Sequence, residues 1–167
     1  MFDKEESVAL LEMVMEQRAT SDIEKLRPSN VDWAPISRAL ERAANPVKAH
    51  YDCAIWTPLA RLLSVGDESE VDAWKIEFCR AILADEAVTE RRAIRWREMH
   101  GRFPDVGPYA MLNFIGNCTK RHEKTVTFRE RIQHYLDNPP DPRRAKNWRL
   151  GHELIWEQYS KLRETYA

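Results

Sequence analysis

Apolar residues recur at intervals of three and four positions along most of this chain, a spacing that places them on one face of an α-helix. In residues 4–18, this face consists of Val8, Leu11, Val14 and Met15. Asp3 precedes the segment and can accept hydrogen bonds from the free amides of its first turn. Because no segment shows a convincing strand alternation, the pattern predicts an all-α fold.

The next helical segments are bounded by residues that begin or interrupt helices. Asp32 can cap the start of a second helix, and Pro46 signals the start of a third. The first turn of a helix tolerates proline because its amides have no partner inside the helix. Pro58 predicts a kink or a restart in the third helix, because an interior proline removes a backbone hydrogen bond. A longer helical pattern follows from about Glu68 to His100.

The stretch from Phe103 to Leu136 is expected to form a short helix, a break at Gly116, and a second, basic helix capped by Thr119. Prolines in residues 137–144 predict a linker, which a last amphipathic helix follows. A helix-turn-helix of this kind commonly presents a helix to the major groove of DNA. It is also a common way of packing two helices, so the pattern fits DNA reading and simple packing alike.

The two halves of the chain share a repeat of aromatic and aliphatic residues at offsets of 72 to 77 residues. The matched pairs are Phe2 with Trp74, Leu10 with Ile82, Trp33 with Tyr109, Ile36 with Leu112, Tyr51 with Phe128, and Ile55 with Ile132. The offsets change within loops, where insertions are well tolerated. The repeat predicts two three-helix units, residues 1–66 and 67–137, followed by a linker and a C-terminal helix in residues 138–167.

This repeat resembles the Myb/SANT domain of the homeodomain-like class over roughly residues 2–136. Residues 2–6, with the leucines at positions 10 and 11, are similar to the family's aromatic, capping residue, acidic pair and leucine. Residues 31–36 are similar to its second signature. The resemblance implies that three helices pack around spaced aromatics and that the third helix reads DNA. Pro58 and the low charge of its third helix imply that the first unit does not read DNA.

The third helix of the second unit carries the candidate nucleic-acid contacts. Basic residues near its start would meet phosphate together with free amides and the positive end of the helix dipole. Arg129 and Arg131 border the apolar stripe, and Gln133 on the outer side can pair with adenine. Glu123 and Glu130 on that side oppose DNA binding, and a solvated amphipathic helix also explains the pattern. The predicted contacts are Lys120, Arg121, Lys124, Thr127, Arg129, Arg131 and Gln133.

The last helix places Trp148, Trp156 and Tyr159 on or beside one apolar face. Such a stripe forms either a lid on the second unit or a surface that binds a protein partner. The alternative to a Myb-like DNA-binding protein is therefore a SANT-type module that binds a partner protein or forms a homodimer, without DNA binding.

Composition narrows the function further. The formal net charge is −1, so any contact with double-stranded DNA must come from a local basic patch. We expect a DNA-binding protein or fragment that acts in the nucleus, in transcription, chromatin or telomere biology. The cytoplasm is left open as an alternative location.

Motifs of other functional classes are missing from the sequence. Three cysteines without a CxxC pair argue against a zinc finger and a disulfide framework, and they favour a reducing compartment. No nucleophile motif, phosphate-binding glycine loop or set of metal ligands is present. We therefore expect a protein that is not an enzyme, with no cofactor and no metal. No apolar run is long enough to span a bilayer, so no membrane is expected as a partner.

Overall fold

The described residues of this computed structural model, 2–120, 126–140 and 146–167, form helices and no strand, with backbone alone for 146–151. This confirms the all-α prediction. The elements before residue 66 are α1 (Lys4–Arg18), η1 (Pro28–Asn30), α2 (Trp33–Leu40), α3 (Ala44–His50), η2 (Tyr51–Trp56) and α4 (Thr57–Val65). The elements after it are η3 (Glu68–Glu70), α5 (Ala73–Ala84), η4 (Arg91–Ala93), α6 (Trp96–Arg102), α7 (Pro108–Cys118), α8 (Phe128–Asp137) and α9 (Lys146–Thr165).

Side-chain caps begin the first two α-helices where the sequence predicts them. The carboxylate of Asp3 accepts a hydrogen bond from the amide of Glu6 at 2.7 Å. The carboxylate of Asp32 accepts one from the amide of Ala34 at 3.3 Å. Each cap satisfies an amide that has no partner inside its own helix.

The longest helical stretch runs without interruption through α3, η2 and α4, and η2 is a π-helix. The prediction of an interruption at Pro58 needs correction, because the helix changes from π to α pitch at Thr57 and continues to Val65. The amide of Thr57 donates to the carbonyl of Asp52, five residues back. Pro58 therefore sits in the first turn of α4 directly after a wider π turn, which accommodates the proline ring.

The elements of the second half differ from the sequence prediction at three points. The helix expected over residues 68–100 is divided into α5 and α6, which η4 and irregular backbone separate. The break expected at Gly116 is absent, because α7 continues to Cys118. Thr119 ends α7 and does not begin the next helix; α8 begins at Phe128 with Thr127 as its N-cap.

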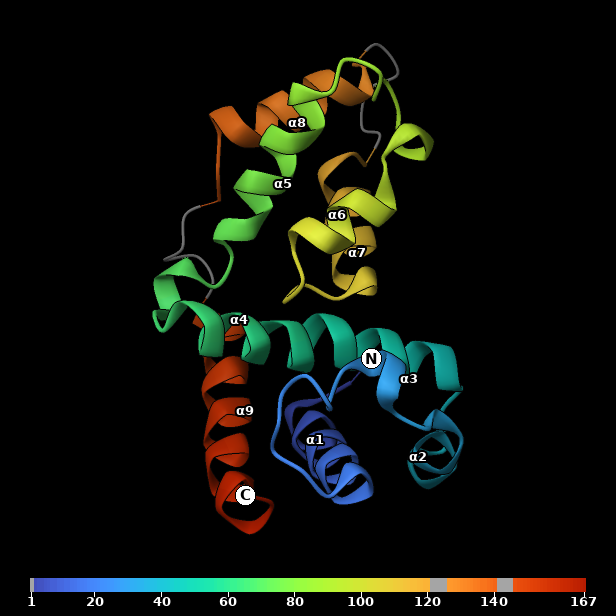
Figure 1. Cartoon of the computed structure of the whole chain (residues 1–167), viewed down its shortest axis with the longest axis vertical. Helices are drawn as coiled ribbons and strands as arrows, with labels where there is room; N and C mark the ends of the chain where they lie inside the picture. Colours follow the sequence, from blue (N-terminus) through green and yellow to red (C-terminus); the bar gives the residue numbers. More distant parts are fainter. Residues whose placement is uncertain (1, 121–125, 141–145) are drawn as a thin grey trace.

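The described residues form two separate hydrophobic cores, and the helices that enclose them lie on opposite sides of the long helix in Figure 1. The first helix group, consisting of α1 to α4 with α9, encloses a core that includes Leu10, Trp33 and Trp56. The second helix group, α5 to α8, encloses a core that includes Phe78 and Met111. Each group buries the apolar stripes of its own helices.

The C-terminal helix α9 packs in the first helix group, beside α1 (Figure 1). Ile155 and Tyr159 are buried there, and the Tyr159 hydroxyl donates to the carbonyl of Ser21 at 2.7 Å. Trp156 is half-buried against the same core. Of the uses predicted for this stripe, a lid on residues 67–137 is therefore wrong, because α9 covers the core of the first helix group instead.

A buried carboxylate joins the two helix groups. Asp52 in η2 is fully buried and accepts hydrogen bonds from the amides of Ala110 at 3.1 Å and Tyr109 at 3.4 Å, in the first turn of α7. The Thr57 hydroxyl donates to Asp52 at 3.3 Å and accepts from the Gly107 amide at 2.9 Å. Asp52 therefore supplies the side-chain cap that Gly107, the N-cap residue of α7, lacks.

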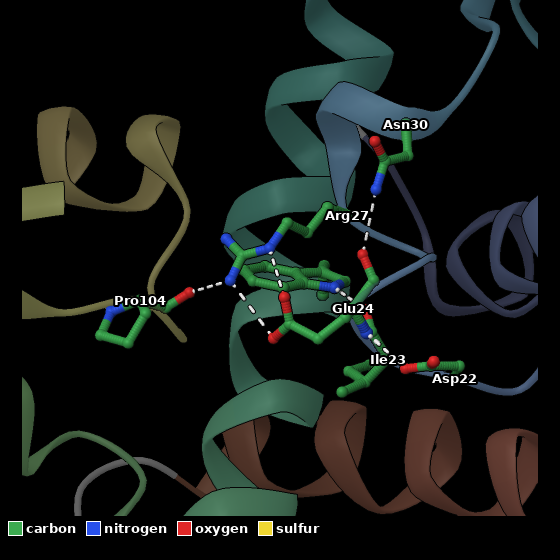
Figure 2. Close-up of polar contacts among 7 residues, drawn as sticks. Asp22, Ile23, Glu24, Arg27, Asn30 and Pro104 are labelled. Carbon is green, nitrogen blue, oxygen red and sulfur yellow. Dashed lines mark hydrogen bonds and ion pairs between the residues drawn. The ribbon is translucent and has the colours of Figure 1, made fainter. Parts of the chain in front are cut away.

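A second connection runs through Arg27, shown in Figure 2. Its guanidinium lies 4.7 Å from the ring centroid of Trp56 and forms two bonds with the Glu24 carboxylate, at 2.8 and 3.2 Å. It also donates to the carbonyl of Pro104, in the second helix group. The Trp56 indole donates to the carbonyl of Ile23 at 2.9 Å. One arginine thus links a loop, the long helix and the second helix group.

Candidate nucleic-acid interface

The helix α8 is held in place by its cap and by its apolar side. The Thr127 hydroxyl accepts a hydrogen bond from the Glu130 amide at 3.2 Å. Ile132 is fully buried in the core of the second helix group, and Phe128 and Tyr135 are half-buried against it. The start of α8 is therefore a fixed point beside the end of α7.

Arg129, predicted to contact phosphate, is directed into the second helix group instead. Its two Nη atoms donate to four carbonyls at the end of α5 and just after it, at distances of 2.7 to 3.4 Å. The acceptors are Ile82, Leu83, Asp85 and Val88. These carbonyls lie where a helix leaves oxygens without intrahelical partners, so the guanidinium stabilises the end of α5. This contact lies at the point where α5 ends, at Ala84.

Arg131 is half-buried and spans the two described ends of the connection between α7 and α8. Its Nη1 donates to the carbonyl of Thr119 at 2.7 Å, and its Nη2 donates to the carbonyl of Val126 at 3.1 Å. These two bonds give Arg131 a structural role, because they hold the end of α7 and the segment before α8 together.

The other predicted contacts have different surroundings. Lys120 is exposed directly after α7. Gln133 is exposed, and its amide donates to the Asp137 carboxylate one turn later, at 3.0 Å. Arg121 and Lys124 lie outside the described residues, as does the side chain of Trp148.

An open groove of about 730 Å³ lies between the segment before α6 and the junction of α7 with α8. Arginines and aromatic residues both line it. The described residues of its wall are Thr89, Glu90, Arg91, Arg92, Trp96, Leu112, Thr119, Val126, Thr127, Phe128 and Arg131. The groove thus brings together Thr127 and Arg131 from the predicted set, and it adds Arg91 and Arg92.

Arg91 and Arg92 lie in η4, directly after the acidic Glu90. Arg92 binds Glu90 at 2.7 Å, yet its side chain is 85% exposed. Such an exposed ion pair contributes at most about 1 kcal/mol, so Arg92 can exchange Glu90 for a phosphate at little cost. Arg91 is exposed beside α7, where a Cβ at Gly116 would lie 3.8 Å from its Nη1. Arg91 and Arg92 belong to a cluster of arginines in residues 91–97, which the sequence displays directly.

A contact between Ser7 and His50 has the residue types of a nucleophile and a base. The Ser7 Oγ lies 2.8 Å from the Nε2 of His50 and donates to the carbonyl of Asp3 at 3.0 Å. Phe2 stacks on the imidazole with ring centroids 4.1 Å apart, and burial lowers the pKa of His50. The stacked ring and the contact between Ser7 and His50 fasten the start of α1 to the end of α3.

The comparisons with known proteins identify no relative. The chain matches no protein-family model, and no curated protein or solved structure matches it. The Myb/SANT resemblance is therefore a hypothesis that depends on the residues quoted for it. Within residues 2–120, 126–140 and 146–167, no helix is long and apolar enough to cross a membrane. The same part of the chain contains no group of three or more His, Cys, Asp or Glu residues arranged to hold a metal ion.

Proposed function

We propose that this protein binds nucleic acid through the groove beside the start of α8, with duplex DNA as its ligand. The observation that carries the proposal is the convergence of Arg91, Arg92 and Arg131 on one open groove. Only one carboxylate, that of Glu90, is among the described residues of the wall. A local positive surface of this kind attracts phosphate even when the net charge of the whole chain is −1.

The positions of the arginines favour contacts with the phosphate backbone over contacts with bases. Arg129 donates to four carbonyls of its own chain, and Gln133 is bonded to Asp137, so the outer side of α8 offers few donors for base edges. The exposed Arg91, Arg92 and Lys120 are suited to phosphate oxygens. Phosphate contacts position a protein on DNA without selecting its sequence. We propose weakly sequence-selective DNA binding in the nucleus, in transcription, chromatin or telomere biology.

A protein-interaction module of SANT type is the second candidate function. Leu112 in the groove wall is 38% exposed, and Trp96 and Phe128 lie in the same wall. Apolar side chains among arginines suit an acidic, partly apolar segment of a partner protein. In this second candidate function, the same groove binds a partner protein in place of DNA.

Fluorescence anisotropy with a labelled DNA duplex tests the proposal. The test variant is Arg91→Ala with Arg92→Ala, and the control is Arg18→Ala with Arg38→Ala, which removes the same charge from exposed positions in α1 and α2. The test variant should lower affinity at least about tenfold and reduce the salt dependence by about two phosphate contacts. The control should bind like the wild type.

Two results would overturn DNA binding. One is a wild-type protein that does not bind the duplex at low salt, where phosphate contacts are strongest. The other is an equal loss of affinity in the test and control variants, because binding would then depend on total charge and not on the groove. The protein-interaction candidate predicts the first result.

A further inference from the structure

The three cysteines have three different environments. Cys53 is half-buried on η2, Cys79 is fully buried on α5, and Cys118 is the half-buried last residue of α7. Cys53 and Cys118 line a cavity of about 360 Å³ between the two helix groups, together with residues such as Lys75 and Tyr135. A small solute in this cavity can therefore reach Cys118.

Cys79 does not line the cavity, and it is in hydrogen-bonding contact with Cys118. The hydrogen bond from Cys79 holds the pKa of Cys118 below its ordinary value, against the effect of burial. The same hydrogen bond, followed by burial and the charge of Cys118, raises the pKa of Cys79. Burial is the main cause that raises the pKa of Cys53 to about 12. Within the contacting pair the thiolate is therefore favoured at Cys118, while the pKa values of Cys79 and Cys53 are raised.

We propose that Cys118 and Cys79 form a peroxide-reactive dithiol, in which Cys118 is the attacking thiol and Cys79 closes an intramolecular disulfide. Two structural features support the assignment: the contact between the two thiols, and the position of Cys118 alone of this pair on the cavity wall. Reactive redox cysteines typically combine thiolate character, access and a second thiol in reach. The proposal does not depend on nucleic-acid binding.

The oxidation is balanced with hydrogen peroxide as the oxidant. The Cys118 thiolate attacks one peroxide oxygen, an S–O bond forms, the O–O bond breaks, and the hydroxide that leaves takes up a proton to become water. Cys118 is then a sulfenic acid. The Cys79 sulfur attacks the Cys118 sulfur, the S–S bond forms, the S–O bond breaks, and a second water leaves with the Cys79 proton. Two thiols are oxidised by two electrons in all, and the peroxide is reduced to two waters.

The first step also prepares the second. Once Cys118 is a sulfenic acid, the negative charge of its thiolate no longer raises the pKa of Cys79. Cys79 can then lose its proton more readily as it attacks. A disulfide between them requires the two sulfurs to approach to about 2 Å.

Mass spectrometry of the full chain tests the proposal. The reduced protein is treated with hydrogen peroxide, its remaining thiols are alkylated, and a peptide map is recorded without reduction. We expect one alkylated cysteine, Cys53, and one linked pair of peptides that joins Cys79 to Cys118. In the reduced protein at neutral pH, Cys118 should be alkylated at least about ten times faster than Cys53, because only the thiolate reacts.

Cysteine variants separate the assigned roles, with circular dichroism confirming that each is folded. Cys53→Ser should form the disulfide at the wild-type rate and serves as the matched control. Cys79→Ser should instead accumulate sulfenic acid at Cys118, which dimedone traps, and Cys118→Ser should form neither product. The proposal is overturned if oxidised wild-type protein keeps three alkylatable thiols, links Cys53 to either other cysteine, or forms only intermolecular disulfides.

Discussion

The substitution Gly107→Ala tests how closely the two helix groups approach each other. Gly107 has an ordinary backbone conformation, with φ −71° and ψ 155°, so alanine causes no backbone strain there. An alanine Cβ at this position, however, would lie 2.1 Å from both carboxylate oxygens of Asp52. The methyl group must therefore displace the carboxylate that caps α7, and the hydrogen bonds to the amides of Tyr109 and Ala110 would be lost.

The size of the effect follows from these contacts. Leaving a buried amide without its partner costs about 1–3 kcal/mol. Replacing glycine by alanine in an unstrained position returns only about 0.4–1 kcal/mol. Gly107→Ala should therefore lower the free energy of unfolding by about 2–3 kcal/mol. In an Asp52→Ala background the methyl group enters the space that the carboxylate has left, and the same substitution should be neutral or slightly stabilising.

Urea unfolding of the wild type, the two single variants and the double variant measures this coupling. Far-UV circular dichroism and tryptophan fluorescence are recorded together, because Trp56 and Trp74 report on different helix groups. Coincident transitions justify a single free energy of unfolding. Gly101→Ala is the matched control, since its Cβ would meet nothing within 4 Å. Within α6 it should be stabilising by up to about 1 kcal/mol.

The coupling energy between positions 52 and 107 should be about 3 kcal/mol, which is larger than the deviation from additivity found for independent sites. Equal destabilisation by Gly107→Ala in both backgrounds would refute it, because the clash would then lie with something other than the Asp52 carboxylate. A Gly107→Ala protein as stable as the wild type would refute the close approach itself.

Two further predictions concern buried polar groups. Burial raises the pKa of Asp52 from 3.8 to about 6, against opposing hydrogen bonds, so its contribution to stability is complete below pH 4 and is lost as the pH rises through 6. Relative to Asp52→Asn, the wild type should lose about 3 kcal/mol between pH 4 and 7 in urea titrations, and parallel profiles would contradict this. Arg129→Met should cost about 3 kcal/mol, because four carbonyls lose a charged donor, whereas Arg80→Met on α5, 65% exposed, should stay within about 0.5 kcal/mol.

Local sequence signals predicted the first helices correctly. Asp3 and Asp32 cap the helices that follow them, and Leu11, Val14 and Met15 of the apolar stripe in residues 4–18 are buried, with Val8 half-buried. These features depend on residues three or four positions apart, which a sequence displays directly. The helical class of the fold follows from the same periodicity.

The repeat pairs are less uniform in the structure than in the sequence. Ile55 and Ile132 are both fully buried, as matched positions should be. Ile36 is 4% exposed, whereas its match Leu112 is 38% exposed in the wall of the groove. A spacing of apolar residues states which side chains share a face, but only packing decides whether another element covers that face.

The sequence did not predict the polar contacts that join residues far apart in the chain. Residues 77 positions apart in the chain, Arg27 and Pro104, meet between the helix groups. Asp52 caps a helix that begins 56 residues later, at Pro108. Neither contact can be recognised from the neighbouring sequence, because nothing near each polar group indicates which distant group it will bind. The π-helical turns before Pro58 likewise belong to a stretch that is packed on both sides.

In the candidate nucleic-acid interface, too, contacts between distant residues could not be predicted from the sequence. A helical wheel of α8 places Arg129 and Arg131 at the edges of its apolar stripe, and it cannot show that carbonyls of α5 lie within reach of one of them. The helical pattern of residues 68–100 places Arg91 and Arg92 in a long helix, whereas in the structure both lie in the short 3-10 helix η4 at the groove. The tertiary structure therefore moves the positive surface from the outer side of α8 to its start. A surface there can follow a phosphate backbone without placing α8 in a major groove, which is why salt dependence, and not sequence selectivity, is the sharper test of DNA binding.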